Sequence, residues 1–288
     1  EGSRDAFHRR SKVNDLKLIM LGTGGAFTRF EHNYHNNALV ETEEGWVLID
    51  CGATAVQSMH EIGIKPWDVA AVLVTHVHGD HVNGIEQLAY ERFYTGERGP
   101  NWAKTLLLTP PSVAPGLVQT LTPGVAELVT PKGATNHGFE TLFDVGTHAP
   151  EGWFFGGVRF MFHETPHIEG AGVSKPSFGV EIRRGDAQLC YTSDTTFLPD
   201  IGSRAHARGL VLHDCTFSPR YAGTVHTHYS ELLTLPPEVR ERVLLMHHGR
   251  VPEGISVEEN GFRGALRRHE QVLVSQKNLV STSLRSKS

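Results

Sequence analysis

The segment HVHGDH at 76–81 places four potential metal ligands within six positions. Imidazole nitrogen and carboxylate oxygen are ligands for zinc, and also for iron or manganese. Residues i and i+2 of an extended segment point the same way, so His76 and His78 can converge on one ion. The glycine between them and the next ligands permits a sharp turn, after which Asp80 and His81 face a second ion. The motif therefore predicts a metal site, and a polar surface loop is the alternative.

One loop cannot complete two metal sites, so further ligands are expected where other strands end. Asp194 follows an expected strand, and a carboxylate there could bridge two cations. His247 is the first residue after the apolar run RVLLM at 242–246. In the segment HETPH at 163–167, either histidine could be a ligand. His163 lies at the end of an expected strand, where it could instead cap the sheet. We therefore prefer His167, which is expected to lie in the loop.

The elements that must position these residues are read from the spacing of apolar residues. Strands are expected at 16–21, 36–42, 45–52, 68–75, 104–110, 157–164, 177–184, 187–194, 209–217 and 242–249. Helices are expected at about 54–62 and 82–93, after Pro115, and near 258–272. Residues 130–152 are rich in Gly, Thr and Pro and are expected to form loops. The expected ligands thus follow strands, where the edge of a sheet can gather them.

Strands and helices alternate without an internal repeat or a low-complexity linker, which favours a layered α/β fold. At 288 residues the chain is near the size at which one core stops growing, and one domain over 16–275 is expected. Residues 1–15 form a polar lead or the end of a linker, and 276–288 a polar tail.

Composition excludes several classes of protein. Lys and Arg total 27 against 32 Asp and Glu, a net charge of −5 that argues against binding nucleic acid by bulk charge. The three cysteines are far apart and give no disulfide framework, and Cys190 and Cys215 lie in expected strands and core. No apolar run is long enough to cross a membrane and the first residues lack a signal-peptide stretch, so a cytoplasmic protein without membrane contact is expected.

The motif HVHGDH, with LGTGG and LIDCG before it and TPH, SDT and MHHG after it, resembles the metallo-β-lactamase superfamily over about residues 16–249. The resemblance implies a four-layer αββα sandwich with a dinuclear metal site at one edge of the sheets. It implies that His76, His78 and His167 hold one metal, that Asp80, His81 and His247 hold the other, and that Asp194 bridges both. The ions would be two divalent cations, first of all zinc, with manganese or iron as alternatives, and they would generate a bridging hydroxide. Asp50 in LIDCG would orient a ligand histidine.

Within the superfamily, the chain resembles the ribonuclease Z-like phosphodiesterases. The Gly-Thr-Gly-Gly run, LHDCTF at 212–217 and VHTH at 225–228 carry this resemblance. It implies that Asp214 orients His226, which protonates the departing oxygen or stabilises charge on the phosphate. His228 is the rival histidine. The expected catalytic residues are therefore Asp80, Asp214 and His226.

Two departures from the tRNA-processing members favour a small phosphodiester, such as a cyclic nucleotide, as substrate. The loop 26–37 differs from their Pro/Lys/Arg-rich loop, and no long basic, Gly-rich arm is present. Arg29, His32 and His35 of this loop could line the pocket or only close the loop. The alternatives are a tRNA 3′-processing endonuclease, a lactone or carboxylic-ester hydrolase, and a metal-stabilised binding module without turnover. Since relatives are often dimers, a homodimer is expected.

Overall fold

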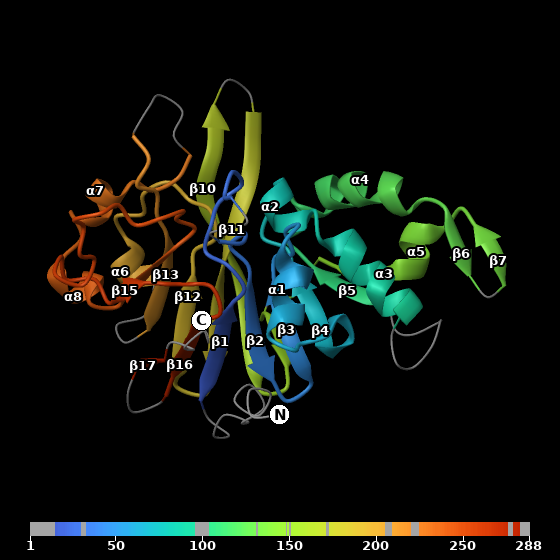
Figure 1. Cartoon of the computed structure of the whole chain (residues 1–288), viewed down its shortest axis with the longest axis horizontal. Coiled ribbons are helices and arrows are strands. Elements are labelled where there is room, and N and C mark those ends of the chain that lie inside the picture. Colours follow the sequence, from blue (N-terminus) through green and yellow to red (C-terminus); the bar gives the residue numbers. More distant parts are fainter. Residues whose placement is uncertain are drawn as a thin grey trace.

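Two β-sheets face each other, and helices cover the outer face of each (Figure 1). The computed structural model describes residues 15–29, 33–95, 104–130, 132–147, 149, 151–170, 173–204, 209–219, 225–275 and 279–282. The layers follow the order helix, sheet, sheet, helix, so the expected αββα sandwich is confirmed. In the described part of the chain, no helix has both the length and the apolar character needed to span a membrane.

The first sheet has eight strands in the order β17-β16-β1-β2-β3-β4-β5-β8. The pairs β3·β4, β4·β5 and β5·β8 are parallel, and the other pairs are antiparallel. The strands are β1 (Leu16–Met20), β2 (Ala38–Thr42), β3 (Gly45–Ile49), β4 (Val69–Leu73), β5 (Thr105–Leu108), β8 (Phe143–Gly146), β16 (Gln271–Val274) and β17 (Leu279–Thr282).

The second sheet has seven strands in the order β15-β14-β13-β12-β11-β10-β9. The pairs β12·β13, β13·β14 and β14·β15 are parallel, and β9 to β12 are antiparallel. The strands are β9 (Trp153–Phe155), β10 (Val158–Gly170), β11 (Val173–Arg184), β12 (Ala187–Tyr191), β13 (Leu210–Asp214), β14 (Val243–Met246) and β15 (Gly264–Ala265). A separate hairpin pairs β6 (Leu128–Thr130) with β7 (Gly133–Thr135).

Three apolar cores hold the layers together. The central core lies between the sheets and contains side chains of both, among them Leu73 and Leu212. A second core packs the first sheet against its helices, and a third packs the second sheet against the helices on its own outer face. Strand β4 supplies Val72 to the outer core and Leu73 to the central core. Because β4 is buried on both faces, its sequence is a continuous run of apolar residues.

The helices fall into two groups on opposite sides of the paired sheets (Figure 1). The first group comprises α1 (Ala55–Glu61), the 3₁₀ turn η1 (Pro66–Asp68), α2 (Gly79–Val82), α3 (Ile85–Thr95), α4 (Ala114–Val125) and α5 (Gly138–Leu142). The second group comprises α6 (Ile201–Arg204), α7 (Tyr229–Leu232) and α8 (Pro237–Arg240). The helix expected at 82–93 is α3, which begins at Ile85, whereas Val82 is the last residue of α2. Every expected strand is present.

Two expectations for the chain's elements are wrong. Residues 258–272 form no helix, because Gly261, Gly264 and His269 have positive φ angles, which interrupt a right-handed helix. This segment instead supplies β15 and the start of β16. Residues 130–152, expected to be loops, contain β7, α5 and β8. Strand β17, within the segment expected to be a polar tail, extends the first sheet beside β16.

Candidate metal centre

The expected ligands gather at one edge of the two sheets, where parallel strands end. His76 comes just after β4, Asp194 after β12 and His247 directly after β14, while Asp214 is the last residue of β13. Because the carboxyl ends of parallel strands meet at one edge, these side chains can converge although they are far apart in sequence. His76 follows the first sheet and the other three follow the second, so the cluster lies across both sheets.

The segment HVHGDH supplies ligands from two kinds of backbone. His78 is extended, with φ −75° and ψ 153°, and precedes the first turn of α2. Asp80 and His81 lie within α2 and are buried. The extended part therefore presents His76 and His78 together, and the helical turn presents Asp80 and His81.

A β-bulge in β10 brings His167 to the same place. Thr165 pairs with Ser177 and Ile168 with Lys175, so two residues of β10 face a single residue of β11. Such a bulge re-aims a side chain that regular pairing would point elsewhere. His167 is buried, and its Nδ1 lies 2.9 Å from the carbonyl oxygen of Val225, to which it can donate.

His163, the alternative to His167, lies away from the described cluster. Its Nε2 is 3.9 Å from the sulfur of Cys190. A Cβ atom added to Gly179 would come within 2.3 Å of the same nitrogen, so the His163 ring covers this glycine. The structure therefore brings His167, and not His163, to the cluster.

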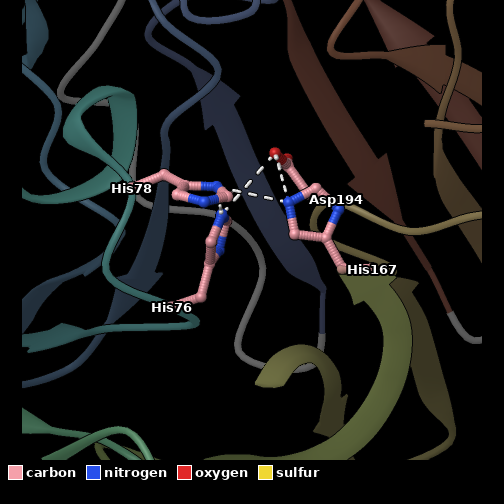
Figure 2. Close-up of side chains that lie close together, drawn as sticks. All are labelled: His76, His78, His167 and Asp194. Carbon is pink, nitrogen blue, oxygen red and sulfur yellow. Dashed lines mark hydrogen bonds and ion pairs between the residues drawn. The ribbon is translucent and has the colours of Figure 1, made fainter. Parts of the chain in front are cut away.

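His76, His78, His167 and Asp194 form a first ligand cluster (Figure 2). The Nδ1 of His78 lies 3.0 Å from Nε2 of His76 and 3.2 Å from Nε2 of His167. Asp194 Oδ2 lies 3.6 Å from Nε2 of His76 and 3.9 Å from Nε2 of His167. Three imidazole nitrogens and one carboxylate oxygen thus lie within 4.8 Å of one another, a donor set that zinc binds.

Asp80, His81, His247 and again Asp194 form the second cluster. The Nε2 of His81 lies 3.4 Å from Asp80 Oδ2 and 3.3 Å from Asp194 Oδ1. The Nε2 of His247 lies 3.3 Å from Asp80 Oδ2 and 3.2 Å from Asp194 Oδ1. Asp194 therefore presents Oδ2 to the first cluster and Oδ1 to the second.

The donor set fits two cations. Nε2 of His81 and Oδ1 of Asp194 are both buried and 3.3 Å apart, and within the described residues neither has the geometry of a hydrogen bond. Buried polar atoms without a partner are costly, and a cation between them would satisfy both. Each histidine also has its remaining nitrogen available for orientation, as metal-binding histidines do: Nδ1 of His81 lies 2.7 Å from Asp50 Oδ2, and Nδ1 of His76 lies 3.1 Å from Thr75 Oγ1. The expected position of Asp50 beside a ligand histidine is what the structure shows.

The charges of the cluster are strongly coupled. Burial, and next the neighbouring His167, lower the pKa of His78 to about 4, so His78 is neutral. Burial would also lower the pKa of His81 and His247, but Asp194 and Asp80 outweigh it and raise both. Burial raises the pKa of Asp80, yet His81 and His247 outweigh it and hold that pKa well below the ordinary value. Without metal the second cluster is thus a network of ion pairs, and a cation would replace the protons of its histidines.

Asp214 and His226 lie beside the second cluster. Nδ1 of His226 is 2.9 Å from Asp214 Oδ2, which also accepts a hydrogen bond of 2.9 Å from the Thr195 backbone N–H. The side chain of His226 is 28% exposed, so its ring reaches the surface. His228, the rival histidine, bonds Ser230 and caps α7 instead.

Two consecutive asparagines also position the site, and the sequence analysis missed their role. Asn36 Oδ1 accepts from the backbone N–H of His247 (3.2 Å), and Asn37 Nδ2 donates to the carbonyl of Asp80 (3.3 Å). Both asparagines are buried, so each fixes the backbone of a ligand. Two adjacent amides directly before β2 were the available signal. Of the loop residues expected near the pocket, Arg29 is exposed, His35 is buried and His32 lies outside the described residues.

The backbone is left-handed at three places along this edge. Asp50, Ser193 and His247 have φ angles of 58°, 55° and 58°. Each comes at most two residues after the end of a strand, namely β3, β12 and β14. A non-glycine residue in this region is uncommon and its conformation costs energy, so the surrounding contacts must hold it.

A family model described as "Anti-Pycsar protein Apyc1" matches residues 16–272 of the chain. The chain belongs to the Apyc1 family. The Apyc1 protein of Paenibacillus sp. (strain J14) is 35% identical over 272 residues, which cover 88% of this chain and 98% of that protein. The Apyc1 protein of Bacillus phage BSP38 is 30% identical over 271 residues, covering 91% of this chain and all of that protein.

Crystal structures similar to this Apyc1 family member confirm the metallo-β-lactamase fold. The metallo-β-lactamase fold protein YhfI from Bacillus subtilis has a TM-score of 0.69 at 16% identity, covering 90% of this chain and 99% of that one. A diphosphatase of the PhnP family has a TM-score of 0.65 at 16% identity, over 89% and 96% of the two chains. Human tRNase Z, short form, has a TM-score of 0.57 at 17% identity, over 81% and 92%. The chain thus combines the metallo-β-lactamase fold with a buried His/Asp cluster that is consistent with a metal site.

Proposed function

We propose that the protein is a zinc-dependent phosphodiesterase that opens a cyclic nucleotide. The observation that carries the proposal is the arrangement of Asp194, whose two oxygens face two separate His/Asp clusters. A carboxylate shared in this way is suited to hold a pair of divalent ions. Such a pair, when bound, lowers the pKa of a water and neutralises charge on the phosphate during an in-line displacement.

Around this pair of ions, we assign some residues to metal binding and one to proton donation. His76, His78 and His167 would hold one ion, Asp80, His81 and His247 the other, and Asp194 both. His226 would give a proton to the departing oxygen from Nε2, because its Nδ1 is engaged by Asp214. The exposure of the His226 ring supports this role, since a proton donor must reach the substrate.

Family membership supports a small substrate. The Apyc1 family, in general terms, counters Pycsar defence, and a cyclic nucleotide is the ligand that this membership suggests. The net charge of −5 likewise favours a small phosphodiester over a nucleic acid. A homodimer, which the resemblance to other family members led us to expect, is tested by sedimentation of the purified protein.

The proposal is tested by offering the zinc-loaded protein a panel of esters. The panel contains 3′,5′-cyclic nucleotides, bis(p-nitrophenyl) phosphate, a tRNA precursor, a lactone and a carboxylic ester. We expect linear nucleotide products from the cyclic nucleotides, with Asp80→Ala as the inactive control. Turnover of the lactone or carboxylic ester alone, or of the tRNA precursor alone, would contradict the proposal.

A further inference from the structure

The carboxylate of Asp214 lies between two imidazole rings. Its Oδ2 is 2.9 Å from Nδ1 of His226, and its Oδ1 is 3.4 Å from Nδ1 of His247. The carboxylate is fully buried, and in the described part of the chain Oδ1 makes no hydrogen bond, so Nδ1 of His247 at 3.4 Å is the polar group that it faces. The Thr195 backbone N–H, which donates to Oδ2, fixes the orientation of the carboxylate. Each oxygen therefore faces the Nδ1 of a different histidine.

The two histidine rings are stacked. Their centroids are 4.7 Å apart and their planes differ by 25°. His247 directs its other nitrogen, Nε2, to Asp80 and Asp194 in the second cluster. His226 has no such second carboxylate at Nε2 among the described contacts, and its ring is partly exposed. The Asp214 carboxylate thus contacts both the His247 ring, which faces the second cluster, and the His226 ring, which faces the surface.

We propose that Asp214 is a shared positioning residue, which orients the metal ligand His247 through Oδ1 and the proton donor His226 through Oδ2. The inference rests on the proposed function, because it needs both a cation at His247 and a proton transfer at His226. A carboxylate that receives the outer N–H of a metal-bound imidazole fixes the orientation of its ring and strengthens the ligand. Sharing one carboxylate also fixes the distance between the proton donor and the second cation.

The chain provides a matched control in Asp50. This buried carboxylate lies 2.7 Å from Nδ1 of His81, another ligand of the second cluster. Its remaining contacts are to the backbone N–H and the hydroxyl of Thr75, not to His226. Asp50 therefore orients a metal ligand alone, whereas Asp214 orients a metal ligand and the proton donor.

The first measurement is zinc affinity, by competition with a chromogenic chelator. We expect Asp214→Asn and Asp50→Asn each to weaken zinc binding by about 10- to 100-fold. His226→Ala should bind zinc with the affinity of the unaltered protein. In the double variant Asp214→Asn/His226→Ala the loss should equal that of Asp214→Asn, because the effect on zinc passes through His247.

The second measurement uses zinc-saturated proteins and two leaving groups. A cyclic nucleotide leaves as an alkoxide and needs a proton, whereas bis(p-nitrophenyl) phosphate leaves as a stable phenolate. His226→Ala and Asp214→Asn should lower kcat for the cyclic nucleotide by about 100-fold or more, and much less for the phenolate ester. Asp50→Asn should lower kcat for the two substrates by the same factor.

Three results would overturn the inference. Unchanged zinc affinity in Asp214→Asn would limit Asp214 to His226, and an unchanged ratio of the two kcat values would limit it to His247. Should Asp214→Asn not fold, the unaltered zinc protein with ¹⁵N-labelled histidines decides: both His226 and His247 should show a hydrogen-bonded Nδ1–H, and its absence from either overturns the inference. If no phosphodiester is hydrolysed, the proposed function fails, and the zinc affinities and Nδ1–H signals still test Asp214.

Discussion

At the scale of single residues, the site depends on which nitrogen each histidine presents. His76, His81, His167 and His247 direct Nε2 to the ligand clusters, while a protein oxygen lies beside Nδ1. His78 does the reverse, since its Nδ1 faces the first cluster. Because the two nitrogens lie at different distances from the backbone, a histidine that presented its other nitrogen would not reach the shared point.

Removal of a single ligand should abolish metal binding at its cluster. We expect Asp80→Ala or His76→Ala to lower kcat/KM by at least about 100-fold, since even residues outside the ligand set change metal affinity or activity by 10- to 100-fold. Zinc content by elemental analysis should fall in both variants from two ions to about one per chain. His163→Ala is the control, because this histidine lies over Gly179 and should keep both ions. Full activity in Asp80→Ala would refute the ligand assignment.

Most of the metal ligands could be predicted from the sequence, whereas the two asparagines that position them could not. Most of the seven expected ligands lie in the two clusters because they follow strands whose ends meet at one edge. His167 is an exception: the sequence places it in a loop, whereas the structure places it inside β10, at a bulge set by the pairing of β10 with β11. The roles of Asn36 and Asn37 depend on backbones far along the chain, which no local pattern contains.

At the scale of elements, the turn before β16 is tied to helix α1. Nε2 of His269 lies 2.9 Å from Ser58 Oγ, and Ser58 donates to the carbonyl of Leu21. The fold of this turn could not be predicted, because a left-handed φ at a histidine leaves no apolar pattern. Strands, by contrast, were predictable, since their apolar runs reflect burial between layers.

The His269 contact predicts a pH-dependent stability. Burial, and next the positive charge of Arg268, lower the pKa of His269 to about 4, whereas the unfolded value is about 6.5. The unfolded chain therefore binds the proton more tightly, so this contribution is complete above pH 6.5 and is lost as the pH falls towards 4. Urea unfolding between pH 7 and 4 should show a smaller loss of stability for His269→Asn than for the unaltered protein.

The replacement Asn tolerates the left-handed φ of 64° better than most residues, which limits strain in the variant. At pH 7 the variant should be less stable by about 1 kcal/mol, because its hydrogen bond to Ser58 is lost. An identical pH dependence in the two proteins would show that His269 is not the group responsible.

At the scale of the whole molecule, the candidate metal centre joins the two sheets. The ligands of HVHGDH follow a strand of the first sheet, and His167, Asp194 and His247 belong to the second. Each cluster contains residues from both. Bound ions would therefore link the two halves of the sandwich in addition to the central core.

Removal of metal should destabilise the entire fold. A ligand at 1,000 times its Kd stabilises the folded state by about 4 kcal/mol. For a domain of this size we therefore expect a chelator to lower Tm by about 8–16 °C. Scanning calorimetry with and without zinc measures the shift. The Asp194→Ala variant, which lacks the shared ligand, should show a much smaller one, and an equal shift would place the stabilising ion elsewhere.

The left-handed residues Asp50, Ser193 and His247 limit how heat tolerance can be gained at this edge of the sheets. Glycine adopts their φ angles without the steric cost of a Cβ atom. At His247, and at Asp50 beside His81, glycine would also remove a metal ligand or the carboxylate that orients one, and with it the stability that bound metal provides. In directed evolution under heat, a glycine codon should therefore be accepted at Ser193 first, and Asp50 and His247 should be retained even when product is not scored.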